Sequence, residues 1–580
     1  MVEYLKQMAD VVASEENKES VEAALSAIIT EIKGKEALIS TDQKLSKVLE
    51  GLIETGRGNM SMIKTLWSQM NTVTLDIVYD QYGSHVLESL IASMASFEEL
   101  DTEFVDILSR FCESIASDLS GILADVRSTH VVRQLALVLG GVSEASNMNI
   151  SEMFSSMTSE MKCESQLKSI AEALTLLTRS DLDAVISKSH SSVTLQVLTV
   201  VIARRFPDIF FRLLDKFSLS EYLVNCLGDK IRSKYVECLA CCSAQNPELL
   251  HRFISLVLLP AGSKTIIATV DGEPLEGDEQ EDASSCVFDK QYAFGFIQSL
   301  IGSIKDDKIF ANSIHTFFTV EKMIECVTKG GANGLGVIQR ITEKLAEFPL
   351  KQTEFVERLL AAIGIVDKEK HKFVWSRIMT LKVSYFGESD IIWDESVDDG
   401  ELTPQGCLLM STMAMFKSSA IQCFISNASP MIDHLTNIEF VNSKWFTQVF
   451  AGRCLQNMIC SKSGFPSGTR KKLIKIVLIS QGTEELTKIA LDKRVGSWLV
   501  TAAWDSCAGD VELKQKLGEG LMAIENLREL SWKIWKHCGL ATFSRRKSDW
   551  TEAEKKKAKA QNLLSDILGE RHQIKKHKMN

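Results

Sequence analysis

Two short stretches of the sequence place a similar polar triplet inside an apolar, helix-like pattern. Residues 83–91 read GSHVLESLI and residues 128–136 read STHVVRQLA, which aligns Ser84, His85 and Glu88 with Thr129, His130 and Arg133. On a helix, Ser84 and Glu88 lie one turn apart on one face, and His85 lies at the edge of that face. The triplet in the second stretch has the same spacing. We therefore expect the triplet to form part of an exposed binding face. We call its three places the first, second and fifth comb positions.

The same triplet recurs along the chain. Clear copies are LSKVLEGLI (45–53), SSVTLQVLT (191–199) and RSKYVECLA (232–240); weaker ones are TFFTVEKMI (316–324), GCLLMSTMA (406–414), SKWFTQVFA (443–451), GSWLVTAAW (496–504) and SWKIWKHCG (531–539). Aromatic residues at the comb positions include Trp445, Trp498 and Trp532, and cationic ones include Lys47, Lys234 and Lys533. Stacking on bases and neutralising phosphates require side chains of these two kinds. A simpler alternative is a polar face that only contacts solvent.

The spacing of the copies indicates the elements that carry them. Neighbouring copies lie 35 to 63 residues apart, except for two larger gaps, the second of which contains the candidate worn copy NGLGVIQRITEKL (333–345). A period near forty residues is typical of helical repeats that bury their apolar faces by stacking. We expect an all-α protein, an α-solenoid of ten to twelve repeats.

Composition agrees with a long helical chain. The sequence has 580 residues, 45% of them hydrophobic and only 8 of them Pro, which excludes a disordered chain and suits long stretches of helix. We find no apolar run long enough to span a membrane and no secretory signal, so we expect an intracellular protein. The 14 Cys are expected to be buried, reduced thiols.

The formal charge of −11 argues at first sight against a polyanionic partner. Two acidic segments, residues 271–282 and 388–401, carry seven acids each and no base, whereas the chain from residue 543 onward is basic. The rest of the chain is close to neutral, so a locally basic face is compatible with the total. The basic tail is expected to be a solvated segment, a nuclear import signal or a contact to the RNA backbone.

Other motifs do not support catalysis or metal binding. Cys238 and Cys241 form one C-x-x-C, but the nearby His251 has no partner that would complete a zinc site. The glycine-rich stretch 330–336 lacks the Lys and Ser/Thr of a phosphate-binding loop. We expect no enzyme activity, no metal and no cofactor.

The stretches GSHVLESL and STHVVRQL resemble the base-facing helix of Pumilio (PUF) repeats. Over residues 40–570, the chain resembles the nucleolar protein 9 family of Pumilio-like ribosome assembly factors. This resemblance rests on the order of three C-terminal stretches, QGCLLMSTM, GSWLVTAAW and WKIWKHCGLATFSRRKSDWTEAEKKKAKAQNLLSDILGE. By the resemblance, the last stretch includes an arginine-rich RRK-x-x-W strand and a short NLLSDIL helix. The resemblance implies a C- or U-shaped array of about eleven repeats. It also implies a monomer that binds small-subunit pre-rRNA in the nucleolus and keeps the endonuclease of the final cut from acting early.

The resemblance also implies which residues contact RNA. Ser with Glu is the pair that Pumilio repeats use for guanine, as at Ser46 and Glu50, Ser84 and Glu88, and Ser233 and Glu237. The full expected set is Ser46, Lys47, Glu50, Ser84, His85, Glu88, Thr129, His130, Arg133, Ser192, Gln196, Ser233, Lys234, Glu237, Phe317, Phe318, Glu321, Lys444, Trp445, Gln448, Ser497, Trp498, Thr501, Trp532, Lys533, Lys536, Arg545 and Arg546.

We expect seven segments: a helical cap (1–40), N-terminal repeats (41–260), an acidic loop (261–290), middle repeats (291–385), a second acidic loop (386–403), C-terminal repeats (404–543) and a basic tail (544–580). The alternative function is a HEAT- or armadillo-like adaptor that binds a peptide and no RNA. A positive face that holds Lys47, Lys234 and Lys533 favours the first reading, and an apolar or acidic face favours the second.

Overall fold

The computed structural model describes residue 7 and residues 18–142, 152–153, 156–158, 161, 163–217, 220–244, 250, 287–387 and 401–560. All extended regular elements in these ranges are helices, and one isolated β-bridge joins Val142 to Met157. The chain divides into two compact units, Met1–Asp306 (unit 1) and Asp307–Asn580 (unit 2). The predicted all-α class is confirmed. Most of both acidic segments and the NLLSDIL stretch lie outside the described residues.

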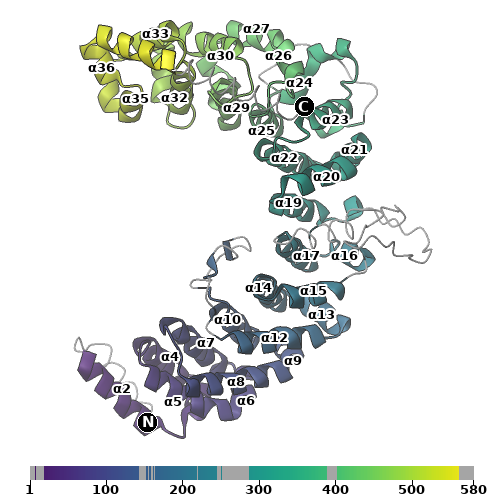
Figure 1. Ribbon diagram of the computed structural model, residues 1–580, viewed down its shortest axis with the longest axis vertical. Coiled ribbons are helices and arrows are strands. Elements are labelled where there is room, and N and C mark those ends of the chain that lie inside the picture. Colours follow the sequence, from purple (N-terminus) through teal and green to yellow (C-terminus); the bar gives the residue numbers. More distant parts are fainter. Residues whose placement is uncertain are drawn as a thin grey trace, which may run out of the picture. The chain divides into compact units, whose positions relative to one another are not determined.

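Unit 1 is a stack of three-helix repeats in which like helices pack on like helices (Figure 1). We call the helices that carry the comb positions the comb helices; here they are α4 (Leu45–Thr55), α7 (Gly83–Ser93), α10 (Thr129–Leu139), α14 (Ser189–Arg205), α17 (Lys230–Ser243) and α19 (Ala293–Ser303). The outer row on the other side of the unit consists of α5 (Met60–Met70), α8 (Thr102–Ser117), α12 (Glu164–Leu176) and α15 (Pro207–Asp215). Short helices link the rows: α6 (Thr74–Tyr79), α9 (Leu119–Ala124), α13 (Arg179–Ile186) and α16 (Ser220–Cys226). Helices α2 (Lys18–Ile32) and α3 (Glu36–Thr41) precede the stack.

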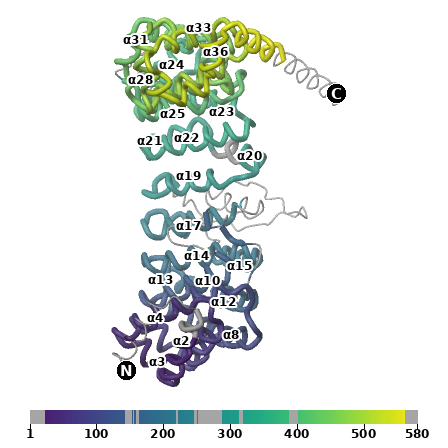
Figure 2. The backbone as a smooth tube through the Cα atoms, turned by 90° about the vertical axis from the view of Figure 1, so that its left-hand side faces the viewer, coloured from purple at the N-terminus to yellow at the C-terminus, as the bar shows by residue number. Residues whose placement is uncertain are grey.

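Unit 2 repeats this arrangement, and its comb helices are α22 (Ala332–Glu347), α25 (Pro404–Met413), α29 (Val449–Ile459), α32 (Gly496–Ser506) and α35 (Trp532–His537). Its other helices are α20 (Asp307–Phe317), α21 (Val320–Gly330), α23 (Gln352–Ala362), α24 (Val374–Met379), α26 (Gln422–Ser426), α27 (Ser429–Asn437), α28 (Lys444–Thr447), α30 (Ser467–Ile474), α31 (Gly482–Leu491), α33 (Val511–Met522), α34 (Leu527–Leu530) and α36 (Leu540–Arg545). The tube in Figure 2 shows successive helices of each unit as stacked rungs. The eleven comb helices of the described residues fit the predicted ten to twelve repeats.

Short 3-10 helices occur at η1 (Asn71–Val73), η2 (Met94–Ser96), η3 (Val287–Asp289), η4 (Lys368–Phe373), η5 (Val383–Tyr385) and η7 (Phe440–Asn442), and a π-helix at η8 (Lys475–Ile479). No single described helix is long and apolar enough to cross a membrane. Helices α13 and α14 would be so by length and composition if taken together, but they are bent by 116° relative to each other. The thirteen described cysteines are free thiols, and ten of them are buried.

An aspartate at or just before the start of several comb helices accepts hydrogen bonds from the backbone there. In α10, Asp125 Oδ1 accepts hydrogen bonds from the backbone amides of Arg127 and Ser128 at 2.9 and 3.0 Å. The same bonds recur before other comb helices at Asp42, Asp80, Asp229 and Asp492. Burial opposes ionisation of Asp125, but these amides and the Ser128 hydroxyl lower its pKa overall. The carboxylates accept hydrogen bonds from amides in the turn that enters each helix, and so stabilise the point where the helix begins.

The core lies between the comb row and the outer row. In α7, Val86, Leu87, Leu90 and Ile91 are at most 1% exposed. These residues lie at i, i+1, i+4 and i+5, so they form one apolar stripe along the helix that faces the core. The side chains between them are left at the surface, which is how the sequence places His85 and Glu88 there.

The C-terminal end of unit 2 is closed by a helix of residues 547–560. Trp550 is buried, with its ring centroid 4.8 Å from that of Phe543 and 6.0 Å from that of Trp504. The expected RRK-x-x-W strand is therefore wrong, because Arg545 ends α36, Arg546 is the one non-helical residue and the next helix follows at once. The buried tryptophan anchors this helix to α32 and α36, so part of the predicted basic tail packs on the repeats.

Candidate nucleic-acid interface

The three comb positions do not share one environment. The first position is buried in six comb helices, at Ser46, Ser84, Thr129, Ser192, Ser233 and Ser497. The second position is exposed or half-buried, as at Lys47, His85, His130 and Lys234, and the fifth is half-buried at Glu50, Glu88, Arg133, Gln196 and Glu237. The expectation that all three positions are exposed is therefore wrong for the first position, which is buried near the start of these six helices. The interface consists of the second and fifth positions, which are three residues apart and adjacent on the helix surface.

Buried hydroxyls at the first position mostly make bonds within the protein. Ser233 Oγ donates to the carbonyl of Lys230 at 3.0 Å, and Ser192 Oγ accepts from Gln196 Nε2 at 3.2 Å. Ser46 Oγ is buried and has no hydrogen-bond partner in the described residues. These hydroxyls can position the fifth residue, but they offer little surface to a ligand.

In comb helices α7, α10 and α17 the second and fifth positions are bonded to each other. His85 Nδ1 lies 2.9 Å from Glu88 Oε2, and Lys234 Nζ lies 3.0 and 2.9 Å from the two oxygens of Glu237. In α10 the Arg133 guanidinium donates to His130 Nδ1 at 2.7 Å, which requires that nitrogen to be unprotonated. Burial and the charge of Arg133 lower the pKa of His130, in agreement with this bond.

Neighbouring comb helices bring these groups together into one surface. Burial raises the pKa of Glu50 on α4, His85 on α7 opposes the shift, and Glu88 adds to it. The pKa of His130 on α10 likewise responds to Glu88 and His85. Charges on α4, α7 and α10 are thus close enough to interact. A ligand that follows the stack would contact them in succession.

The last comb helices of unit 2 combine aromatic and cationic side chains. Trp498 on α32 is 47% exposed, and Lys533 Nζ on α35 lies 3.0 Å from the centroid of its ring. Trp532 and Lys536, also on α35, are exposed. Cation and indole attract each other here, and the pair can stack on a base and neutralise a phosphate. These four residues lie where the sequence predicted them.

Six other predicted site residues lie off the comb row. Trp445 is fully buried in α28, which begins at Lys444, and Gln448 follows that short helix. Phe318 is 2% exposed between α20 and α21, Glu321 lies in the first turn of α21, and the side chain of Phe317 lies outside the described part of the chain. The predicted copies at 316–324 and 443–451 are therefore corrected. Their repeats present comb helices α22 and α29 instead, with Leu335, Gly336 and Gln339, and Gly452, Arg453 and Gln456. Arg545 and Arg546 are exposed beyond the last comb helix.

Sequence reasoning missed one comb helix entirely. Residues 291–301 read QYAFGFIQSLI, and residues 81–91 read QYGSHVLESLI. The shared Gln-Tyr and Ser-Leu-Ile could have revealed α19, whose comb positions are Phe294, Gly295 and Gln298. The copy 406–414 was found, and its comb positions in α25 are Cys407, Leu408 and Ser411.

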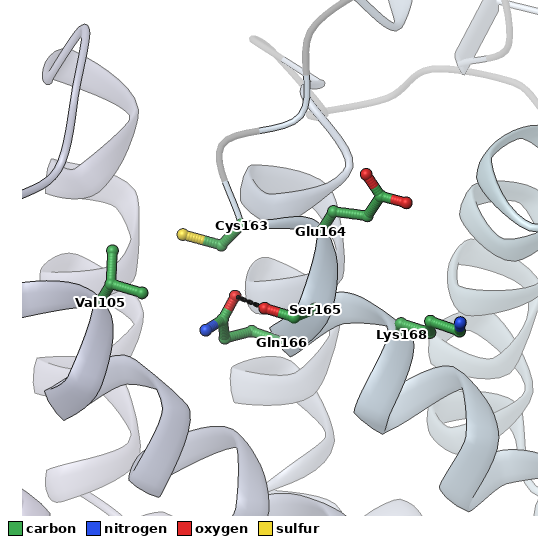
Figure 3. Close-up of a pocket in the computed structure, with 6 residues that line it drawn as sticks. All are labelled: Val105, Cys163, Glu164, Ser165, Gln166 and Lys168. Carbon is green, nitrogen blue, oxygen red and sulfur yellow. Dashed lines mark hydrogen bonds between the residues drawn. The ribbon is translucent and has the colours of Figure 1, made fainter. Parts of the chain in front are cut away.

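The hollows found on the described surface do not contain the comb residues. A hollow of about 430 Å³ between α8 and α12 is lined by Val105, Cys163, Glu164, Ser165, Gln166 and Lys168 (Figure 3). Ser165 Oγ donates to Gln166 Oε1 at 2.8 Å, and Gln166 Nε2 donates to Ser109 Oγ at 2.7 Å. The second of these bonds joins the outer-row helices α12 and α8. No group of metal-ligating side chains occurs among the described residues.

Known proteins share this architecture. Residues 34–180 match the family described as NOP9-like PUF repeat domain. Nucleolar protein 9 of Komagataella phaffii is 29% identical over 160 residues, and that of Yarrowia lipolytica is 30% identical over 128 residues. These alignments cover 24% and 20% of this chain, and only 24% and 17% of the respective relatives.

Among solved structures, APUM23-GGAGUUGACGG superposes with a TM-score of 0.69 and 18% identity, over 96% of this chain and 99% of the other. At this identity the likeness shows the fold. The stretch 34–180 contains comb helices α4, α7 and α10, so the family match and the comb geometry concern the same repeats. Residues 34–180 are therefore similar to a NOP9-like PUF repeat domain, and the resemblance of the chain to the nucleolar protein 9 family is confirmed.

Proposed function

We propose that this protein is a nucleolar RNA-binding factor of ribosome biogenesis that holds RNA on the comb helices. The observation that carries the proposal is the placement of the second comb position at the surface of successive repeats, with the fifth position beside it at the surface in all comb helices except α25 and α32, where Ser411 and the predicted Thr501 are buried. Three of these repeats fall within the NOP9-like match. The relatives are named Nucleolar protein 9, which supports the nucleolar localisation.

The chemistry of the comb residues suits RNA. Ionised Glu50, Glu88 and Glu237 accept hydrogen bonds only, so they suit the N–H groups at the edge of a guanine. Gln196 offers both a donor and acceptors, and exposed Trp498 offers a ring on which any base can stack. A few bases would be read at their edges and the rest held by stacking and charge.

The finer function is the one that the family resemblance implies. The bound RNA is the small-subunit pre-rRNA, and the protein shields the site of the final cut from premature action by its endonuclease. The matched family is a repeat family rather than an enzyme family, which supports a protein that binds RNA without cutting it.

The test measures binding of the purified chain to fluorescent fragments of small-subunit pre-rRNA and to a scrambled RNA, across a series of salt concentrations. Micromolar or tighter binding that prefers the natural sequence is expected, and Glu88→Gln should reduce that preference. The matched control is Glu113→Gln on α8, an exposed carboxylate in the outer row of the same unit. Equal binding to both RNAs that survives Glu88→Gln, or no binding, would refute the proposal and favour a protein-binding adaptor.

A further inference from the structure

Lys234 lies at the second comb position of α17 and forms two hydrogen bonds to the fifth position of the same helix. Its ammonium contacts both carboxylate oxygens of Glu237, at 3.0 and 2.9 Å. The lysine side chain is 61% exposed, whereas that of Glu237 is 15% exposed. Lys234 is therefore the more exposed member of the pair, and its ammonium contacts a carboxylate of which only a small part is exposed.

A similar arrangement occurs on α7, where His85 Nδ1 lies 2.9 Å from Glu88 Oε2. In both helices the cationic or imidazole group is three residues before the carboxylate. The recurrence at equivalent positions of two repeats shows that the pairing belongs to the comb and not to one helix.

A bare carboxylate at this surface would repel RNA. Glu237 is largely removed from water, and the phosphates of a bound RNA would add like charge close to it. A bonded ammonium cancels that charge while each carboxylate oxygen keeps a lone pair for an N–H donor. The same bond fixes the side-chain rotamer of Glu237, so less conformational freedom is lost when a base binds.

The neighbouring comb helix leaves room for such a base. Gly295 occupies the second comb position of α19, and a Cβ atom built there would lie 3.5 Å from Glu237 Oε1. Because glycine has no side chain, α19 does not cover this carboxylate oxygen from the second comb position, and a base that approaches from that side meets no side chain of Gly295.

We propose that Lys234 is a positioning residue: it balances the charge of Glu237 and orients its carboxylate toward a base, instead of stacking on the base or holding a phosphate. This inference rests on the proposed RNA-binding function. It assigns His85 the same role toward Glu88 when its imidazole is protonated.

The test is a double-mutant cycle on RNA affinity with Lys234→Met, Glu237→Gln and the two combined, at about 50 and 200 mM salt. Lys234→Met should weaken binding about five- to tenfold at the lower salt, and the loss should shrink at the higher salt because the exposed carboxylate is screened. Glu237→Gln should weaken discrimination between bases.

The combined variant decides the role. If Lys234 acts through Glu237, adding Glu237→Gln restores most of the affinity that Lys234→Met removes, and Lys234→Arg binds like the unchanged protein. If Lys234→Met costs the same factor in both backgrounds, the lysine contacts RNA itself and the inference is overturned.

Two controls complete the design. Lys488→Met breaks a similar pair with Glu485, with side chains 51% and 16% exposed, on α31 outside the comb row, and should leave RNA affinity unchanged. Thermal melting of every variant is measured alongside, so that a loss of affinity caused by loss of the folded state is recognised. If the unchanged chain binds no RNA, the proposed function itself fails. If it binds RNA and the cycle is additive, only the inference fails.

Discussion

In the repeat of α28 and α29, two nearby residues should affect different properties: one should affect stability and the other RNA affinity. Trp445 on α28 is fully buried, and Arg453 on α29 is exposed at the second comb position. The sequence pattern alone assigned the binding role to Trp445. The structure instead makes Trp445 a core residue and leaves Arg453 free to meet a ligand.

Truncating Trp445 to Ala removes a fully buried indole, a change that costs about 3–5 kcal/mol in protein cores. Its Nε1 has no hydrogen-bond partner in the described residues, so no bond is lost with it. Trp445→Phe is the matched control: it keeps most of the apolar volume and removes the unpaired N–H, so a much smaller loss is expected. Amide hydrogen exchange of α29 measures both changes as the free energy of local opening.

Arg453→Ala should change the stability of α29 by less than about 0.5 kcal/mol, because the side chain is at the surface. Its effect should appear in RNA binding instead, as about a fivefold loss at 0.1 M salt and a salt dependence shallower by about 0.7. Arg453→Lys keeps the charge and should recover most of the affinity. If Trp445→Ala leaves α29 stable and abolishes RNA binding while Arg453→Ala changes neither, the assignment of the comb helix is wrong.

Three further predictions concern the packing that holds the comb in place. Asp125→Ala should destabilise α10 by about 1–2 kcal/mol at pH 7, measured by hydrogen exchange. Because the folded pKa of Asp125 is lowered, its contribution is present above the unfolded pKa and disappears as pH falls through the folded pKa. The variant and the unchanged chain should therefore converge in acid, and a constant difference would contradict the capping role. Glu554→Ala should destabilise the packing of the helix 547–560 by about 3–5 kcal/mol, because Lys514, which is 10% exposed and 2.6 Å away, loses its partner. Amide hydrogen exchange in this helix at the same rate as in the unchanged chain would refute this prediction. Gly452→Ala should lower the melting temperature, with a cost of about 1–3 kcal/mol, because the added Cβ would meet the side chain of Val495; an unchanged melting temperature would show that Val495 moves aside.

The repeat architecture could be predicted from the sequence because its signal is redundant. Each comb helix of unit 1 repeats an apolar pair at a fixed offset, so an error in one copy does not change the period. The exposure of the second comb position also followed from helix geometry. The burial of the first position did not, because Ser84 and Thr129 are small polar residues that suit either environment.

The register error in unit 2 has a local cause. The pattern of a short polar residue followed by apolar pairs was read at Ser443, which is the N-cap of α28, a helix of only four residues. The true comb helix α29 starts at Val449 with no side-chain cap, so its first turn carries no marker. By contrast, Asp42, Asp80 and Asp125 lie three or four residues before α4, α7 and α10 and accept backbone hydrogen bonds in the turn that enters each helix. Where the cap is absent, local sequence cannot show which helix faces the ligand, and only packing decides.

The net charge of −11 therefore says little about the comb surface. Two of its carboxylates, Glu88 and Glu237, are bonded to groups on their own helices, so they add little repulsion toward a polyanion when those groups are charged. Arg453 and Lys536 are exposed cations of the same row in unit 2. Since an exposed unpaired cation releases counterions when it binds a phosphate and an internally paired one does not, the salt dependence of RNA binding should reflect the exposed unpaired cations alone. A measured salt slope that follows total charge, unchanged by Arg453→Ala, would mean that RNA is held elsewhere on the chain.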